Sequence, residues 1–296
     1  MDNSQVIFAL DIGTRKVMGI AARKTGEGLE ILASITIEHE SRPMLDGQIQ
    51  NIEEVAKTVL LIKNSLEEQL GLKLSAAGVA VAGRDLITHR SKARRDFEQE
   101  QEITQEIVKD LELEAVDDIL SDPQKNSANF YCAGYSPVYY ELNGAKISHP
   151  LGHRGKEFSC EIIVTLLNRA VLDSMFSVLK LTGLEPINLT LEPIAAINAI
   201  VPAELRHLNI ALVDIGAGTS DLALTREGFI YAYGMVPMAG DEITEDISQA
   251  LLTDFLTAEN IKRSVNIKER IAYEDIWGRK QEISSQEVKD KASASI

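Results

Sequence analysis

The sequence has little of several features that would identify common classes of protein. Among its 296 residues, 30 are Lys or Arg and 45 are Asp or Glu, so the net charge is −15. This excess of acid argues against nucleic-acid binding, because nucleic-acid-binding surfaces are basic. No apolar run reaches the length of a transmembrane helix, and the start Met1-Asp2-Asn3 lacks the basic and apolar regions of a signal peptide. We therefore expect a cytoplasmic protein that does not bind nucleic acid.

Cysteine and histidine are also scarce. The two cysteines, Cys132 and Cys160, fit a reducing compartment and are expected to be two separate core thiols. The five histidines show no metal-binding spacing. His149 and His153 are four apart, but a proline and a glycine between them argue against a helix that would bring them together. We therefore expect no metal site built from histidine.

One glycine-rich stretch organises the chain. The apolar run 210–213 leads into Asp214, a Gly-x-Gly-Thr turn follows at Gly216, Gly218 and Thr219, and an alternating run begins at Leu222. The pattern predicts a β-hairpin whose turn exposes backbone N–H groups, which form a cradle for an anion. A carboxylate at the base of this turn would repel a phosphate unless a divalent cation lay between them. A plain glycine-rich hairpin is the alternative for a single stretch of this kind.

The same pattern occurs earlier in the chain. Asp11-Ile12-Gly13-Thr14 follows the apolar run 6–10, and Lys16 at the turn is able to reach a phosphate as a point charge. In each copy a third strand pattern follows, at 29–37 and 229–236, and then an amphipathic helix. An internal repeat of this kind predicts two similar α/β lobes that clasp one phosphate chain between opposed hairpins. We expect Asp11 and Asp214 to face each other and to hold Mg²⁺ largely through water.

The segments between the two hairpins predict the rest of the first lobe and an insertion. A helix is expected from its cap at Asn51 to Gly71, and strands at 78–82 and 187–191 extend the first sheet to five. The block from about residue 84 to 157 is basic at 90–95 and acidic at 96–122, where apolar residues at four-residue spacing predict a helix. These opposite charges either contact a partner or another protomer, or pair within the block.

The segments after the insertion carry further candidate site residues. Glu192 and Pro193 open an alanine-rich helix, and Gly240 opens a helix that we expect to continue through Phe255 with its N-terminus suited to phosphate. Glu259 and Lys262 share a helical face, where an ordinary surface pair is expected. From Asp275 onward the chain is polar, and we expect no completing strand in residues 289–296.

Taken in order, these motifs resemble the actin/DnaK/hexokinase ATP-binding superfamily and, within it, the cell-division FtsA family. The resemblance implies an actin-like ATPase fold with duplicated ribonuclease H-like lobes. The first lobe would comprise residues 1–83 and 158–201, and the second would comprise residues 202–296. The position of the insertion, 84–157, is similar to the small α+β subdomain of FtsA and of the pilus-assembly protein PilM. The second lobe would be incomplete, because the chain stops before the Gly-Gly adenosine loop of the family.

The resemblance also implies roles for individual residues. ATP or ADP would be the ligand, with Mg²⁺ held by Asp11 and Asp214. Glu192 would position the attacking water, or would merely cap the helix at Pro193. Asp221 is expected to act through its neighbours rather than on the ion. The residues expected to contact the nucleotide are Gly13, Thr14, Lys16, Gly216, Gly218 and Thr219 at the phosphates, Gly240 at the second connecting helix, and Glu259 and Lys262 at the ribose and adenine.

The implied function is that of an actin-like scaffold in bacterial cell division. Such a scaffold would assemble into filaments, recruit division proteins such as FtsZ, and hydrolyse ATP slowly in its full-length form. A PilM-like pilus protein, a DnaK-type chaperone ATPase and a sugar or carboxylate kinase are the alternatives. The chain lacks the amphipathic helix by which FtsA lies on the inner face of the membrane, so membrane contact would need a segment absent here. We expect this chain to bind ATP weakly and to associate through an open sheet edge in its second lobe.

Overall fold

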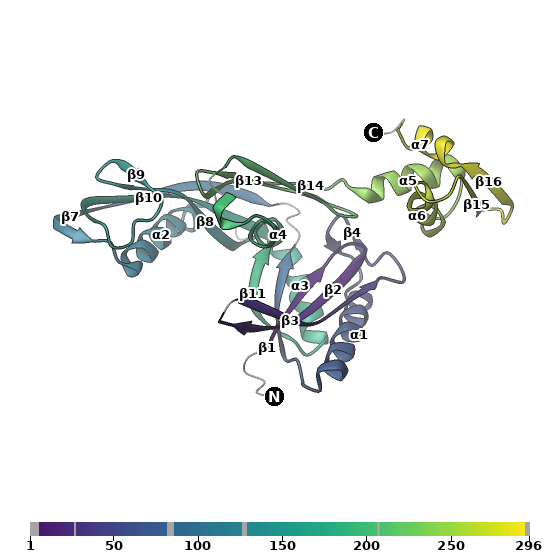
Figure 1. Ribbon diagram of the computed structural model, residues 1–296, viewed down its shortest axis with the longest axis horizontal. Coiled ribbons are helices and arrows are strands. Elements are labelled where there is room, and N and C mark those ends of the chain that lie inside the picture. Colours follow the sequence, from purple (N-terminus) through teal and green to yellow (C-terminus); the bar gives the residue numbers. More distant parts are fainter. Residues whose placement is uncertain (1–5, 27, 82–85, 126–128, 206–207, 294–296) are drawn as a thin grey trace.

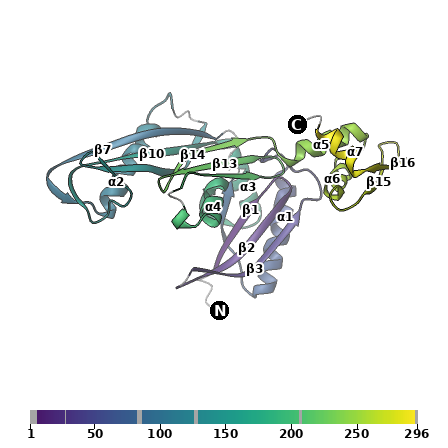
Figure 2. The ribbon, with the colours of Figure 1, turned by 45° about the horizontal axis from the view of Figure 1, so that its top comes forward.

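The computed structural model describes residues 6–26, 28–81, 86–125, 129–205 and 208–293. The molecule is elongated (Figure 1). A five-stranded sheet with two helices forms its base, two further sheets run above it, and a small helical unit lies at the far end. The view in Figure 2 shows the same arrangement, with α4 between the base and the upper sheets. No helix in the described ranges is both long and apolar enough to cross a membrane.

The first sheet has the five strands that the sequence predicts. Its order is β11-β6-β1-β2-β3, with β6 parallel to both β1 and β11 and the β1-β2-β3 meander antiparallel. The strands are β1 (Val6–Ile12), β2 (Lys16–Thr25), β3 (Gly28–Glu38), β6 (Ala76–Val81) and β11 (Glu185–Leu191). Two helices, α1 (Ile52–Leu70) and α3 (Arg169–Leu181), pack on one face and bury a single apolar core. The expected strand at 78–82 therefore begins two residues earlier, and residue 82 lies outside the described residues.

Local capping sets the limits of α1. The side chain of Asn51 accepts a hydrogen bond from the Glu54 N–H, and Gly71 ends the helix with φ of 66°. Before the helix, the short strands β4 (Met44–Leu45) and β5 (Gln48–Ile49) form a hairpin that turns at Asp46 and Gly47. This hairpin matters for the site, because its turn lies beside both glycine-rich loops.

The insertion forms a four-stranded sheet of order β7-β10-β8-β9 with α2 (Gln105–Leu120) packed on it. Its strands are β7 (Ile87–Glu102), β8 (Phe130–Leu142), β9 (Ala145–Ile147) and β10 (Arg154–Asn168). The acidic stretch from Asp96 begins as strand, since its first residues pair with β10 up to Glu102, and the predicted helix follows near the expected start at Thr104. The helix itself starts after Thr104, whose hydroxyl accepts from the Ile107 N–H. Cys132 and Cys160 are two separate thiols in this sheet, as predicted.

The basic segment of β7 pairs within the insertion. Glu161 on β10 forms ion pairs with Arg90 and Lys92, with N···O distances of 2.8 and 3.1 Å. Arg94 pairs with Glu157 at an N···O distance of 3.1 Å. Arg95 pairs with Glu114 of α2. Arg94 and Arg95 thus pair within the block 84–157, whereas Arg90 and Lys92 pair with Glu161, beyond its expected end.

The second sheet has three antiparallel strands, β12 (Ile210–Ile215), β13 (Ser220–Arg226) and β14 (Phe229–Val236). It packs on α4 (Glu192–Ile200) and on the inserted sheet, through a core that includes Ile197, Ala223 and Tyr233. A short 3₁₀ turn at Ala203–Leu205 joins α4 to β12. Among the described residues β12 pairs only with β13, and its Ile215 is 69% exposed. The expected open edge is therefore present.

The last segment forms its own small core. It comprises α5 (Gly240–Leu251), α6 (Phe255–Ser264), the β15 (Arg270–Glu274) and β16 (Lys280–Ser284) hairpin, and α7 (Ser285–Ser293). The single helix expected through Phe255 is wrong. Leu252 adopts φ of 50° and ends α5, and Asp254 caps α6 by accepting from the Thr257 N–H. In the described segments β15 and β16 pair only with each other.

Close packing of α1 on the first sheet gives the first prediction. A side-chain carbon at Gly19 of β2 would overlap Cγ2 of the buried Ile62 and would lie 3.2 Å from atoms of Leu66 and Phe8. Gly19→Ala should therefore lower the free energy of unfolding by about 1–3 kcal/mol in urea titrations. Gly26→Ala is the matched control, because nothing lies within 4 Å of the added carbon, and its effect should stay within about 0.5 kcal/mol. Equal effects of the two changes would contradict this packing.

Candidate functional site

The two glycine-rich turns have the same backbone geometry. In the first, the Gly13 N–H donates to the Lys16 carbonyl at 3.0 Å, and in the second the Gly216 N–H donates to the Thr219 carbonyl at 2.9 Å. A side chain at either glycine would lie 3.2 Å from that same carbonyl oxygen, which explains the glycine at both positions. Asp11 and Asp214 each stand two residues before these glycines, at the ends of β1 and β12. The structure therefore supports the duplication inferred from the sequence.

The two turns touch each other. A side-chain carbon at Gly218 would lie 2.8 Å from Oγ1 of Thr14 and 2.9 Å from Cα of Asp46. The Thr14 hydroxyl in turn accepts a hydrogen bond from the Gly47 N–H at 3.0 Å. Thr14 and Gly218, both predicted to contact phosphate, thus also hold the loops and the β4–β5 hairpin together.

Most of the predicted phosphate and metal residues line one cavity. This cavity has a volume of about 270 Å³ and lies between the two turns. Its lining residues are Asp11, Gly13, Thr14, Arg15, Lys16, Gly47, Glu192, Asp214, Ile215, Gly216, Ala217, Thr219 and Asp221. The structure therefore brings Glu192 of α4 to both turns, as expected if it acts on a ligand held between them. Asp221, which we expected to act through its neighbours, also lines the cavity.

Burial and neighbouring carboxylates raise the pKa values of Glu192, Asp221 and Asp11 at this cavity. Burial, and then repulsion from Asp11, Asp221 and Asp214, raises the pKa of Glu192 to about 8. Burial and repulsion from Asp214 raise the pKa of Asp221 to about 6. Burial and Asp214 also raise the pKa of Asp11, although Lys16 opposes the shift. A cluster of this kind favours a bound cation, which would relieve the repulsion.

These residues fit a magnesium ion that is held mainly through water. Carboxylates suit Mg²⁺, which keeps several of its waters in proteins. Oδ1 of Asp221 is buried without a hydrogen-bond partner, so one acceptor at the cavity is free for a water or an ion. Within the part of the chain that the structure describes, no three His, Cys, Asp or Glu side chains come together to hold an ion. Direct coordination by a full set of protein ligands is therefore not the arrangement seen here.

The remaining predicted ligands lie together beside the second turn. The N–H groups of Gly240 and Asp241, at the start of α5, donate to the carbonyls of Gly216 and Ala217 at 3.2 and 2.7 Å. Those two donors are engaged by the second turn and are not directed at a phosphate. Lys262 donates to the Gly240 carbonyl at 2.7 Å and lies 2.6 Å from Glu259.

Glu259 is a buried charge rather than a member of the surface pair expected from its spacing. It is 7% exposed and accepts hydrogen bonds from Thr244 at 2.6 Å and from Arg263 at 2.9 Å. These donors, together with Lys262, lower its pKa to about 2 despite burial. Its role toward ribose or adenine, like that of Lys262, stays a prediction.

Sequence reasoning missed two residues at the first turn. Arg15 lines the cavity, and only its place beside Thr14 and Lys16 could have indicated it. His39 lies behind the turn, where Nε2 is 3.3 Å from the Gly13 carbonyl and Nδ1 is 3.1 Å from the Thr58 hydroxyl. Because a carbonyl only accepts, Nε2 carries the proton. No local pattern indicates this contact, since β2, β3 and the first turn must fold before His39 meets Gly13.

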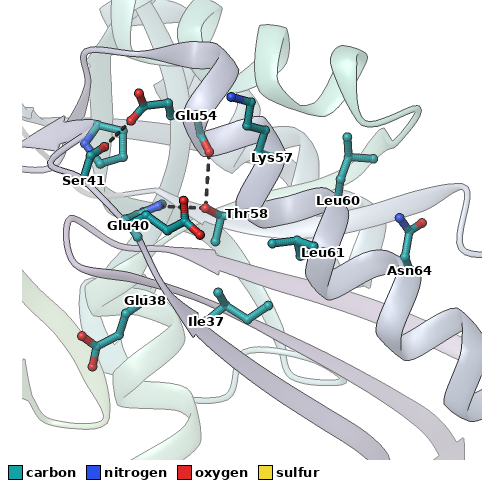
Figure 3. Close-up of a pocket in the computed structure, with 12 residues that line it drawn as sticks. Ile37, Glu38, Glu40, Ser41, Glu54, Lys57, Thr58, Leu60, Leu61 and Asn64 are labelled. Carbon is teal, nitrogen blue, oxygen red and sulfur yellow. Dashed lines mark hydrogen bonds between the residues drawn. The ribbon is translucent and has the colours of Figure 1, made fainter.

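A larger cavity of about 530 Å³ lies nearby between the end of β3 and α1. Figure 3 shows Leu60, Leu61 and Ile37 at its apolar side and Glu54 and Lys57 at the opposite side. The larger cavity contains neither glycine turn. The smaller cavity, which holds the opposed turns and the carboxylates, is therefore the candidate functional site.

Comparison of the sequence with known proteins points to one family. A family model described as "Cell division protein FtsA" matches residues 211–294. The cell division protein FtsA of Pseudomonas aeruginosa is 29% identical over 266 residues, which cover 88% of this chain and 61% of the relative. The chain therefore spans less than two thirds of the length of this relative. The sequence resemblance to FtsA is confirmed.

Comparison of structures identifies the fold. The PilM–PilN type IV pilus biogenesis complex aligns with a TM-score of 0.65 and 17% identity, over 87% of this chain and 69% of that one. MreB5 of Spiroplasma citri bound to ADP aligns with a TM-score of 0.51 and 16% identity, over 99% of this chain and 75% of that one. The chain has the actin-like ATPase fold, as predicted.

The raised pKa of Glu192 predicts a dependence of stability on pH. The carboxyl ionises near pH 4.5 in an unfolded chain but near pH 8 in the folded one. Its contribution to stability is therefore complete below about pH 4.5 and is lost as the pH rises to about 8. In EDTA, the free energy of unfolding of the unaltered chain should fall between pH 6 and 8 relative to that of Glu192→Gln.

Urea titrations at several pH values check this prediction. Glu185→Gln serves as control, because Glu185 is exposed at the opposite end of β11 and should leave the pH profile unchanged. A difference between Glu192→Gln and the unaltered chain that does not vary between pH 6 and 8 would show that Glu192 is already ionised in the cavity.

Proposed function

We propose that this chain is an actin-like ATP-binding scaffold of the FtsA type that acts in bacterial cell division. The observation that carries the proposal is the pair of equivalent glycine turns that enclose a cavity with Asp11, Asp214 and Glu192. The similarity to FtsA gives this site its biological setting, and 29% identity to an FtsA exceeds the 17% identity to the PilM complex. We propose residues 1–83 and 158–201 as one lobe, 84–157 as an inserted subdomain and 202–296 as a second lobe.

The two turns would bind the phosphate chain of ATP or ADP from opposite sides. In this proposal Gly13, Gly216 and Thr219 supply backbone or hydroxyl groups to the phosphates, and Lys16 adds a positive charge. When bound, Mg²⁺ neutralises phosphate charge and orients the phosphate oxygens. Asp11 and Asp214 would hold it through its waters, which also separates their carboxylates from the phosphates.

In this proposal Glu192 accepts a proton from the attacking water. It starts α4 and lines the cavity with both candidate metal-binding carboxylates. Phosphoryl transfer depends on positioning and charge stabilisation, so one carboxylate that orients a water suffices for slow hydrolysis. A pKa near 8 leaves Glu192 largely protonated at neutral pH, and a bound cation would lower that pKa and make the carboxylate an acceptor.

The proposal extends to assembly in response to nucleotide. The scaffold would form filaments and recruit division proteins such as FtsZ, in the cytoplasm at the inner face of the membrane. Because Arg94 and Arg95 pair within the insertion, we do not assign the contact between protomers to them.

Calorimetric titration of ATP, with Mg²⁺ or with EDTA, tests the site. We expect weak binding, in the range above micromolar, that Mg²⁺ strengthens. Asp11→Asn and Asp214→Asn should each reduce the ratio of the two affinities by about tenfold, or about 1.4 kcal/mol, because each removes a carboxylate that holds the hydrated ion. Asp173→Asn, at an exposed position of α3, is the control. Binding that does not depend on Mg²⁺ in the unaltered chain would refute the metal role.

Phosphate release tests the role of Glu192. Glu192→Gln should slow hydrolysis of Mg-ATP by about 100-fold or more, since it removes the proton acceptor. Its affinity for Mg-ATP should stay within about threefold of the unaltered chain, because the turns and the ion site remain. Unchanged turnover would leave Glu192 as the first residue of α4 and nothing more.

A further inference from the structure

Arg15 connects the first glycine turn to the last helices of the chain. Its side chain is only 16% exposed and lines the cavity between the turns. Its guanidinium pairs with Asp241 of α5 and lies 3.3 Å from Oε1 of Glu259 of α6. The same guanidinium lies 5.0 Å from the ring centre of Phe255. One arginine therefore borders the phosphate cavity and contacts α5 and α6.

Arg42 makes a similar contact without lining the cavity. It lies 2.7 Å from Glu245 and 3.8 Å from Asp241, and its guanidinium stacks 3.7 Å from the ring centre of Phe255. The chain thus supplies two arginines that bind the same surface of α5 and α6. They differ in one respect, since only Arg15 borders the space where phosphates would lie.

The cavity needs positive charge for an anionic ligand. Four carboxylates line it, and the cationic side chains among its lining residues are Arg15 and Lys16. A guanidinium offers five donors in a planar fork that matches phosphate oxygens, whereas an ammonium acts as a point charge. Arg15 is therefore the better suited of the two for a directed contact with a phosphate.

The carboxylates that now pair with Arg15 have other partners. Glu259 keeps Lys262 at 2.6 Å, Arg263 at 2.9 Å and the Thr244 hydroxyl at 2.6 Å. Asp241 keeps Arg42. An exchange of partners by Arg15 would therefore leave neither carboxylate as an unpaired buried charge, which is the costly outcome in such networks.

We propose that Arg15 is a phosphate-binding residue that exchanges Asp241 and Glu259 for the terminal phosphates of the bound nucleotide. This inference rests on the proposed function of the same site. The exchange couples phosphate binding to the position of α5 and α6, because the Arg15 guanidinium that would bind the phosphates also holds those helices to the first turn. Arg42 keeps the helices attached in both states.

Calorimetric titration of Mg-ATP, Mg-ADP and AMP into the chain and its variants tests the exchange. Arg15→Gln should weaken Mg-ATP binding by about tenfold to 100-fold, the effect of losing hydrogen bonds to a charged group. Its effect on AMP should stay within about threefold. Arg42→Gln is the matched control, because it removes a contact to the same helices but lines no part of the cavity, and it should leave Mg-ATP affinity within about threefold.

Three outcomes would overturn the inference. Equal affinities for Arg15→Gln and the unaltered chain would show that Arg15 does not touch phosphate. If Arg15→Gln and Arg42→Gln changed the affinity for Mg-ATP by the same factor, in either direction, both arginines would only attach the helices to the first lobe. Failure of the unaltered chain to bind Mg-ATP would refute the proposed function as well, and this outcome is distinguishable because it needs no variant.

Hydrogen exchange of residues 255–264 gives a second readout. Mg-ATP should change the exchange rates of α6 in the unaltered chain and in Arg42→Gln, but not in Arg15→Gln. Arg15→Lys keeps the positive charge but loses the planar set of guanidinium donors, so its affinity for Mg-ATP should be intermediate. This variant serves as the test if Arg15→Gln does not fold. Full affinity in Arg15→Lys would leave only a point charge at this position and would contradict a directed contact.

Discussion

The close approach of two backbone turns is the constraint on which the rest of the structure depends. Gly218 lies against Thr14 and Asp46 at a distance that leaves no room for a side chain. Only this approach places Asp11 and Asp214, which are about 200 residues apart in the sequence, on one cavity and brings Glu192 to them. The five-stranded sheet, the β4–β5 hairpin and α4 all serve to hold the two turns at this separation.

Much of the fold was predictable because the chain repeats itself. Two acidic glycine turns after apolar runs predict the two hairpins, and the first sheet has the five predicted strands. Boundaries were less predictable where short-range signals compete. The start of α2 near Thr104 was predicted, whereas the extent of β7, which pairs with β10 up to Glu102, was not. The sequence pattern predicted one helix through residue 255. It is divided because Leu252 adopts a left-handed backbone conformation and Asp254 caps a new helix.

The candidate site divides in the same way. Its carboxylates and glycines follow from motifs, since residue type and spacing indicate their chemistry. The environments of Glu259, Arg15 and His39 depend instead on contacts between segments far apart in the chain. Spacing alone presented Glu259 and Lys262 as a surface pair, yet Arg15 and Thr244 complete a buried charge network around Glu259. Sequence reasoning finds a ligand site where the ligand contacts local backbone, and it fails where side chains meet only after folding.

The hydrogen bond between His39 and Gly13 has a practical consequence. The hydrogen bond to the Gly13 carbonyl requires the proton on Nε2 and so favours one tautomer, and burial lowers the pKa of the imidazole, which favours its neutral form. The two ring nitrogens of neutral histidine tautomers give different ¹⁵N chemical shifts. A movement of the first turn that lengthens this bond would therefore change the ¹⁵N chemical shifts of His39. These shifts report the position of the turn without an added label.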